Sequence, residues 1–202
     1  GDDVLRGNAG SDQLRGEAGD DVLYADSFDT VIEGGSGTDT LHVEGSTGVS
    51  IVAGAGIENA FGNVGDDVFD GTDLGVSAHF DGGAGGDVLT GGSGDDTLIG
   101  GTGDDVIAGD AGDDHVVGGS GDDTITGGEG QDVVEFLGSM ANFTFAAAAN
   151  GTLTITDTTT MEGTDVISGV ETLRFADGDL TVTTTEQGAV TLTGTDVDDV
   201  IT

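Results

Sequence analysis

The sequence contains no cysteine, no proline and no tryptophan, and only three of its 202 residues are Lys or Arg. Without cysteine the chain has neither disulfides nor thiolate metal sites, so it needs another means of stabilisation outside a cell. Without a basic surface it has no electrostatic footprint for nucleic acid, and an anionic membrane surface would repel it. No apolar run reaches the length of a membrane span, so we expect no membrane insertion, and no signal peptide is visible at the N-terminus.

Acidic residues and glycine dominate the composition instead. Asp and Glu together number 40 and give a formal charge of −37, and there are 41 glycines. Repulsion among so many carboxylates opposes any compact state that lacks counter-cations. Aromatic residues make up only 4%, which favours a thin, repetitive core over a conventional layered one. The expected partners are therefore cations, with calcium as the first candidate.

A nine-residue unit repeats six times without interruption over residues 82–135. GGSGDDTLI (91–99) and GGSGDDTIT (118–126) are representative. In all six units the first and fourth positions are glycine, the sixth is aspartate and the eighth is Leu, Ile or Val. A fixed period of this kind indicates a stack of similar structural units. The polar sixth column and the apolar eighth column predict one ligand position and one core position in every unit.

The same frame continues outside this run. It covers residues 1–42, and one further unit spans residues 62–70. Thr30 replaces the sixth-position aspartate of one unit and Asp29 lies one place early, which predicts a weakened or altered site there. The carboxylates predicted to bind metal are Asp3, Asp12, Asp21, Asp39, Asp67, Asp87, Asp96, Asp105, Asp114, Asp123 and Asp132. The glycines predicted to form the metal-binding turns are Gly82, Gly83, Gly85, Gly91, Gly92, Gly94, Gly100, Gly101, Gly103, Gly109, Gly112, Gly118, Gly119 and Gly121.

The two halves of each unit predict a turn followed by a strand. The first six residues place glycine where a turn needs positive φ or close backbone approach. The stretch from the sixth residue to the ninth alternates like a short strand with the eighth residue inward. Two units then make one coil, and stacking at about 4.8 Å brings Asp87 and Asp105 to one edge and Asp96 and Asp114 to the other. Like charges so placed repel by about 1 to 4 kcal/mol per pair. Calcium suits the gap because it accepts about 6 to 8 oxygen ligands, both carboxylate and backbone carbonyl.

This nonapeptide, G-G-x-G-x-D-x-U-x, resembles the repeats-in-toxin (RTX) or hemolysin-type calcium-binding family. The resemblance implies an all-β fold, a right-handed parallel β-roll or β-helix solenoid with calcium in its turns. It also implies a secreted protein of a Gram-negative bacterium that leaves the cell through a type I secretion channel. In the family the repeats stay unfolded at low cytosolic calcium and fold outside the cell.

Non-repeat stretches divide the chain into predicted parts. We expect a first repeat block at 1–42, a spacer coil at 43–61, a second block at 62–135 with an insertion at 71–81, a cap at 136–184, and at 185–202 a linker with the start of another repeat. Gly56–Phe61 and Gly169–Phe175 share a G-φ-E signature. The cap also predicts a hairpin that pairs Phe143–Ala147 with Leu153–Thr156 across an Asn150-Gly151 turn. Such a cap would cover the open end of a solenoid.

No catalytic constellation stands out. His42, His79 and His115 are dispersed and lack H-E-x-x-H spacing, and acids that recur every nine residues do not resemble a single catalytic pair. We therefore expect no enzyme activity and a calcium-binding structural module that holds about six to eight ions. Three roles stay open: a secretion and folding module of an exported enzyme or toxin, a repeat of an adhesin or surface-layer protein that self-associates into a filament or lattice, or a polysaccharide-binding module.

Overall fold

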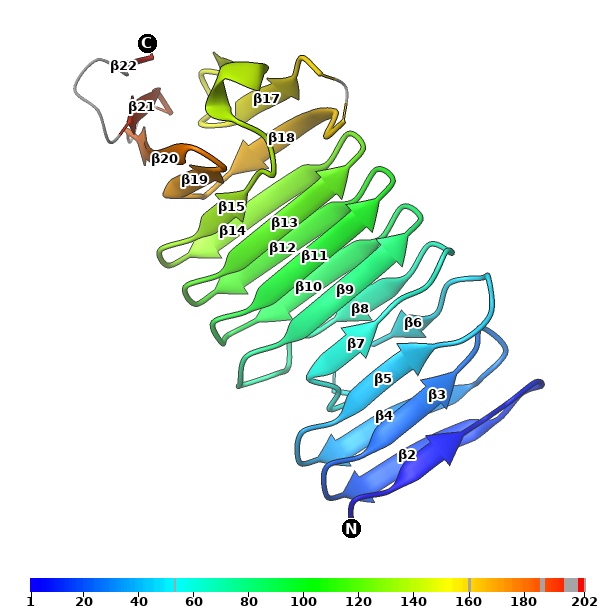
Figure 1. Cartoon of the computed structure of the whole chain (residues 1–202). Coiled ribbons are helices and arrows are strands. Elements are labelled where there is room, and N and C mark those ends of the chain that lie inside the picture. Colours follow the sequence, from blue (N-terminus) through cyan, green and yellow to red (C-terminus); the bar gives the residue numbers. More distant parts are fainter. Residues whose placement is uncertain (53, 160, 186–187, 195–199, 202) are drawn as a thin grey trace.

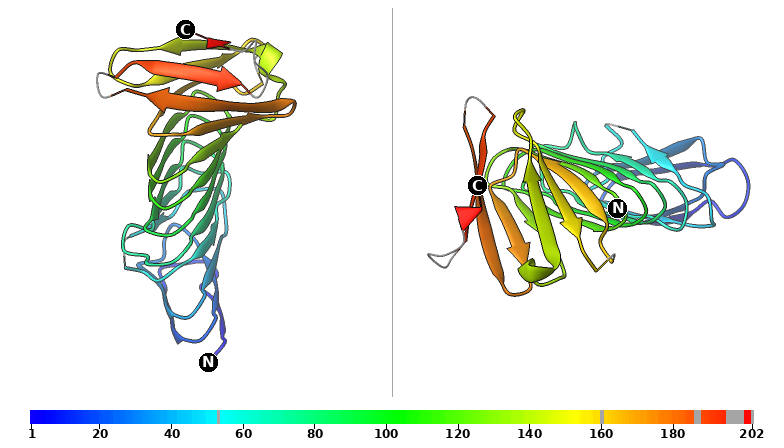
Figure 2. Two further views of the ribbon diagram at one scale, coloured as in Figure 1. Left: turned by 90° about the vertical axis from the view of Figure 1, so that its left-hand side faces the viewer. Right: turned by 90° about the horizontal axis from the view of Figure 1, so that it is seen from above.

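The structure is a computed structural model that describes residues 1–52, 54–159, 161–185, 188–194 and 200–201. It is an all-β parallel solenoid of about seven turns, with the two chain ends at opposite ends of an elongated body (Figures 1 and 2). The fold class predicted from the repeats is confirmed. Within the described residues, no helix is long and apolar enough to cross a membrane.

A 12-stranded sheet, the first sheet, runs the length of the molecule. Its strands pair in parallel from β1 to β19, and β19 to β22 continue it in antiparallel pairing. In sheet order they are β1 (Val4–Arg6), β3 (Val22–Ala25), β5 (Thr40–Val43), β7 (Asn59–Phe61), β9 (His79–Ala84), β11 (Thr97–Thr102), β13 (His115–Ser120), β15 (Val133–Glu135), β19 (Thr172–Phe175), β20 (Gly178–Thr184), β21 (Val190–Gly194) and β22 (Val200–Ile201).

The opposite wall is divided. An eight-stranded sheet, the second sheet, contains β6 (Ser50–Ile51), β8 (Val68–Asp70), β10 (Val88–Gly92), β12 (Val106–Ala111), β14 (Thr124–Glu129), β18 (Thr164–Ser168), β17 (Leu153–Asp157) and β16 (Phe143–Ala147). A separate two-stranded sheet contains β2 (Gln13–Ala18) and β4 (Val31–Ser36). A cleft of about 260 Å³ lies at the seam between β4 and β6, with Ile32 and Ser50 in its lining. The repeat unit that contains Thr30 (residues 25–33, the degenerate unit) and the spacer coil therefore interrupt one wall, while the first sheet is continuous.

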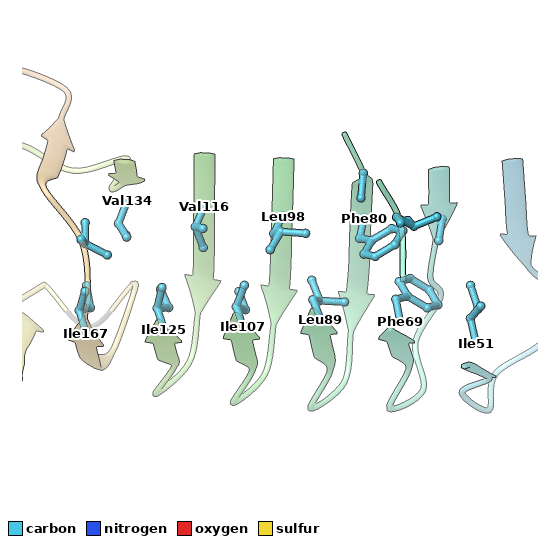
Figure 3. Close-up of a cluster of buried hydrophobic side chains, with 14 of the residues drawn as sticks. Ile51, Phe69, Phe80, Leu89, Leu98, Ile107, Val116, Ile125, Val134 and Ile167 are labelled. Carbon is cyan, nitrogen blue, oxygen red and sulfur yellow. The ribbon is translucent and has the colours of Figure 1, made fainter. Parts of the chain in front are cut away.

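The register follows from the length of two repeat units. Val88 pairs with Val106 and Leu89 with Ile107, so each strand lies directly above the equivalent residues of the next coil. Because a strand alternates its side chains, every eighth-position residue points inward. Leu89, Leu98, Ile107, Val116, Ile125 and Val134 are all at most 1% exposed and form two facing columns (Figure 3). Each buried aliphatic side chain of this kind contributes about 1.5–3 kcal/mol.

The insertion at 71–81 ends in an aromatic core residue. Phe80 lies at the start of β9, is 1% exposed, and packs edge-on against Phe69 with ring centroids 5.7 Å apart. In the register of the first sheet Phe80 follows Ala60, so a large ring compensates for a small neighbour in the same column. The core is thereby continuous across the irregular coil.

The cap contains the predicted hairpin. β16 and β17 pair antiparallel from Phe143 with Asp157 to Ala147 with Leu153, which confirms the hairpin with one more residue than expected. A 3₁₀ turn, η1 (Met140–Asn142), leads into it. The rings of Phe136, Phe143 and Phe175 lie 5.1–5.2 Å apart between the two walls. Of the segment predicted at 185–202 to be a linker with the start of another repeat, residues 186–187, 195–199 and 202 lie outside the described residues.

An aromatic stack crosses the outer face of the first sheet and was not predicted. Tyr24, His42 and Phe61 pair in register on β3, β5 and β7, and their rings stack with centroids 5.1–5.2 Å apart. The guanidinium of Arg6 lies 3.9 Å from the Tyr24 ring centroid. His42 thus contributes to cross-strand packing.

Candidate metal centres

The sixth-position aspartates form two ladders along the edges of the roll. The first ladder precedes the strands of the first sheet and the second ladder precedes those of the opposite wall. Asp3, Asp21, Asp39, Asp96, Asp114 and Asp132 lie in the first ladder, and Asp12, Asp67, Asp87, Asp105 and Asp123 lie in the second. The expected separation of Asp87 and Asp105 from Asp96 and Asp114 is what the topology produces.

Each acidic residue of a ladder is one rung, and one hydrogen bond links each rung to the next. The backbone N–H of Asp87 donates to Oδ1 of Asp105 at 2.7 Å, and that of Asp105 donates to Oδ1 of Asp123 at 2.9 Å. In the first ladder, Asp96 donates to Asp114 at 2.8 Å in the same way. Each carboxylate therefore uses one oxygen to fix the turn of the preceding coil, and the turn conformation orients the other oxygen.

The second oxygen of most rungs is buried without a hydrogen-bond partner. Among the described residues, Oδ2 is such an atom in Asp21, Asp39, Asp87, Asp96, Asp105, Asp114, Asp123 and Asp132. These side chains are at most 2% exposed. Burying a carboxylate oxygen without a hydrogen-bond partner costs free energy, because the oxygen loses its hydrogen bonds to water and forms none within the protein. The same unpaired atom recurs eight times, which makes these positions candidates for binding a cation.

Backbone oxygens face the same positions. A Cβ atom built on Gly109 would lie within 3.0 Å of both Asp114 Oδ2 and the carbonyl oxygen of Gly127, one coil further on. The first-position glycine thus leaves open a space that is bounded by oxygens of two successive turns. At the second position, Gly101 has φ +113, and its Cβ would lie within 3.0 Å of the Gly83 carbonyl oxygen. Any side chain at Gly101 would clash with the backbone, and the positive φ would also be strained for a residue other than glycine.

Burial and repulsion raise the pKa values of these carboxyl groups. Burial is the largest cause, one backbone hydrogen bond to each group lowers the value in part, and neighbouring carboxylates raise it again. The pKa of Asp105 is raised to about 7, and the pKa values of Asp87, Asp96, Asp123 and Asp132 are raised to about 6. The charged form is therefore disfavoured at these positions unless a cation accompanies it.

The donor set fits calcium. The ladders offer carboxylate and backbone carbonyl oxygens, whereas zinc prefers N and S ligands. An ion between two turns would draw on the aspartate Oδ2 atoms and on glycine carbonyl oxygens such as that of Gly127. Calcium accepts this mixture of hard oxygens in a flexible geometry, whereas magnesium demands near-ideal octahedra.

Three predicted aspartates have a different environment. Asp3 is exposed and Asp12 is half-buried, since both lie in the first coil. Both oxygens of Asp67 accept hydrogen bonds, Oδ1 from Val49 N–H at 2.6 Å and Oδ2 from Asn63 N–H at 3.1 Å. Both carboxylate oxygens of Asp67 thus have hydrogen-bond partners within the protein, whereas each central rung has one oxygen without a partner.

The degenerate unit keeps its rung through Asp29. Its Oδ1 accepts the N–H of Asp12 at 3.0 Å and its Oδ2 accepts the N–H of Asp26 at 2.9 Å. Thr30 instead donates its hydroxyl to the Asp12 carbonyl at 3.1 Å. With both carboxylate oxygens engaged, Asp29 differs from the central rungs. The altered site remains a prediction that this geometry favours.

Three further acids occupy ladder positions that the repeat did not identify. Asp165 accepts the N–H of Asp123 at 3.0 Å, Glu58 accepts that of Asp39 at 2.8 Å, and Glu171 accepts that of Asp132 at 2.9 Å. The shared G-φ-E signature was the available signal for the two glutamates. For Asp165 the signal was Gly163 two residues earlier and Ile167 two residues later, which repeat the fourth and eighth positions.

The fifth-position aspartates form an outer ladder, which was also not predicted. Asp104 Oδ1 accepts the N–H of Asp122 at 2.9 Å, and Asp95 Oδ1 accepts that of Asp113 at 3.0 Å. These side chains are exposed. Their role in the structure is to hold successive turns in register.

Comparison with known families identifies the repeats. The profile of the RTX calcium-binding nonapeptide repeat, which spans four copies, matches residues 1–32, 81–116 and 108–136. A search of curated proteins finds no match to the chain. The matched segments contain nine of the eleven predicted aspartates and most of the unpaired oxygens described above. These matched segments are RTX calcium-binding nonapeptide repeats, and the parallel solenoid is consistent with an RTX β-roll.

Proposed function

We propose that this chain is a structural module that folds when calcium binds outside the cell and that its parent protein is exported by type I secretion. RTX repeats are calcium-binding modules of secreted proteins, and proteins that carry them are generally exported by that route. The proposal adds the coupling of folding to calcium and the route for this particular chain. The role is structural rather than catalytic.

The observation that carries the proposal is the set of eight buried aspartate oxygens without partners. In the folded chain they require a cation, and in the unfolded chain they are hydrated. A chain of formal charge −37 also repels itself when it becomes compact. Calcium reverses both effects, so the folded state should depend on it.

We propose one ion for each of the eight unpaired oxygens, six in the second block and two in the first. Each ion would lie between two successive turns on one edge of the roll. This number is at the upper end of the six to eight expected from the sequence. Ions that bind only the folded chain stabilise it by RT ln(1 + [Ca]/Kd) each, or about 2.7 kcal/mol at a hundredfold excess over Kd.

Circular dichroism during a calcium titration tests the proposal. The chain should be largely unfolded in a strong chelator and should gain a β spectrum cooperatively as free calcium rises. Magnesium at the same concentration is the control and should induce little structure, because it tolerates this ligand geometry poorly. A β spectrum that is unchanged by the chelator would overturn calcium-driven folding. Self-association into a filament and polysaccharide binding stay predictions.

A further inference from the structure

Two turns of the roll are shorter than the nonapeptide turn. In a regular unit the aspartate of the ladder lies five positions after the first-position glycine, as in Gly109 and Asp114. In 56–58 (G-I-E) and 169–171 (G-V-E) the glycine and the acid are only two residues apart. Gly56 and Gly169 both have positive φ, +62 and +59. The apolar residue between glycine and acid is buried in both turns.

The glutamate of each short turn takes the place of the aspartate. Glu58 Oε2 accepts the N–H of Asp39, and Glu171 Oε2 accepts the N–H of Asp132, at 2.8 and 2.9 Å. The register of the following strand is also kept, since Thr172 pairs with Val133. A glutamate side chain is one methylene longer than aspartate. That extra length lets the carboxylate reach the ladder from a turn that is three residues shorter.

The oxygens that face a cation in the regular turns recur here. Asp39 and Asp132 are fully buried, and Oδ2 of each has no hydrogen-bond partner among the described residues. A Cβ on Gly127 would lie within 3.0 Å of both Asp132 Oδ2 and the carbonyl oxygen of Gly169. On Gly34 it would meet Asp39 Oδ2 and the Gly56 carbonyl oxygen in the same way. Each short turn therefore presents its carbonyl where a regular turn does.

We infer that the two short turns complete calcium sites, with Glu171 closing the site of Asp132 and Glu58 closing the site of Asp39. Each site takes one carboxylate and one glycine carbonyl from outside the nonapeptide pattern. The inference rests on the proposed calcium binding and extends it to residues that the family repeat does not include. It makes the non-repeat segments part of the metal-binding structure.

One consequence concerns the cap. Glu171 immediately precedes β19, and Asp165 in β18 occupies the corresponding rung opposite the unpaired oxygen of Asp123. The cap thus meets the last regular coil at a cation position on both edges. Calcium binding at these two positions holds the cap on the roll, and their loss should loosen the cap first.

Native mass spectrometry and calorimetric titration with calcium alone test the inference. Glu171→Gln keeps an oxygen that can accept the Asp132 N–H but removes the charge, so the variant should bind one ion fewer than wild type. Glu58→Gln should lose one ion from the first block. Glu171→Asp keeps the charge but shortens the side chain, and it should also lose the ion because its carboxylate falls short. Glu135→Gln is the matched control, since that carboxylate pairs with His115 on the outer face, and it should keep every ion.

The outcomes separate the inference from the proposed function. A wild-type chain that binds no calcium would overturn both. A wild-type chain that binds several ions, with unchanged number and affinity in Glu171→Gln and Glu58→Gln, would overturn the inference alone. If either variant fails to fold, a crystal structure of the calcium-loaded wild type decides. An ion bound by Asp132 Oδ2 and Glu171 would support the inference, and no ion between those turns would refute it.

Discussion

Replacing Asp105 by Asn should change stability in opposite directions with and without calcium. The amide oxygen of Asn can still accept the N–H of Asp87, which the Asp105 carboxylate accepts at 2.7 Å. The variant therefore keeps the ladder while removing one buried charge and one candidate calcium ligand. Asp105 is 1% exposed, so this charge is not shielded by solvent.

The magnitudes follow from the burial and from the two sites that Asp105 joins. In chelator, the pKa of Asp105 is raised from 3.8 to about 7 by burial and by its carboxylate neighbours. At pH 8 the ionised group then destabilises the folded chain by roughly 4 kcal/mol, which Asn relieves. In calcium, the variant weakens its own site and that of Asp87. At about 2.7 kcal/mol per site the lost calcium stabilisation is about 5 kcal/mol. Against the roughly 4 kcal/mol gained by removing the charge, the variant should be about 1 kcal/mol less stable than wild type in calcium.

Folding induced by trimethylamine N-oxide in chelator, followed by circular dichroism at pH 8, measures the first effect, because this osmolyte favours burial. The variant should fold at a lower osmolyte concentration than wild type. Thermal denaturation in calcium measures the second effect, and the variant should melt at a lower temperature. Asp104→Asn, an exposed change on the same turn, should do little in either buffer. Shifts of the Asp105 variant in the same direction in both buffers would refute the cation-facing assignment of its second oxygen.

Three further outcomes are expected. In chelator, the folded fraction measured by circular dichroism should rise as pH falls from 8 to 5. The folded pKa values of residues such as Asp105 lie above the unfolded ones, so their stabilisation is present below about pH 4 and is lost as pH rises through about 6–7. A fall in folded fraction over this range would contradict the reasoning. Gly101→Ala should lower the free energy of unfolding in calcium, measured by urea denaturation, by about 1–3 kcal/mol, since φ is +113 and the Cβ meets the Gly83 carbonyl. The control Gly86→Ala, at an exposed position, should change it by less than about 0.5 kcal/mol. Equal effects of the two substitutions would refute the turn argument. Asp157→Asn should lower the melting temperature at pH 7. Burial raises the pKa of Asp157, but hydrogen bonds from the following turn outweigh burial and lower the pKa to about 2. The stabilisation by this carboxylate is therefore present above about pH 4 and is lost as pH falls towards 2. An unchanged melting temperature would show that this turn does not depend on the carboxylate.

The periodic part of the chain could be predicted from the sequence because one local rule governs it. A glycine turn and an alternating strand of fixed length set the register, so the inward position of Leu89 and the edge position of Asp105 follow from counting. The prediction of the Phe143–Ala147 hairpin succeeded for a similar reason, since Asn150-Gly151 determines the pairing locally.

The remaining features depend on contacts between coils. Glu171 reaches its rung only because the turn before it is shortened, and Asp165 lies 42 residues from the Asp123 N–H that it accepts. The outer aspartate ladder and the stack of Tyr24, His42 and Phe61 arise from residues one coil apart, so a single unit does not reveal them. The pattern also gave no sign that β4 and β6 would belong to different sheets.

That seam has a consequence for how the molecule melts. In a solenoid, stability is approximately the sum of the intrinsic stability of each coil and the coupling between neighbours. Among the described residues, strands of both walls pair between the other coils of the roll, but across the seam strand pairing is limited to the first sheet, where β5 pairs with β7. The coupling free energy should therefore be weakest there. As calcium is withdrawn, the N-terminal block with two candidate ions should melt before the block with six, and the seam should act as the boundary between two cooperative units.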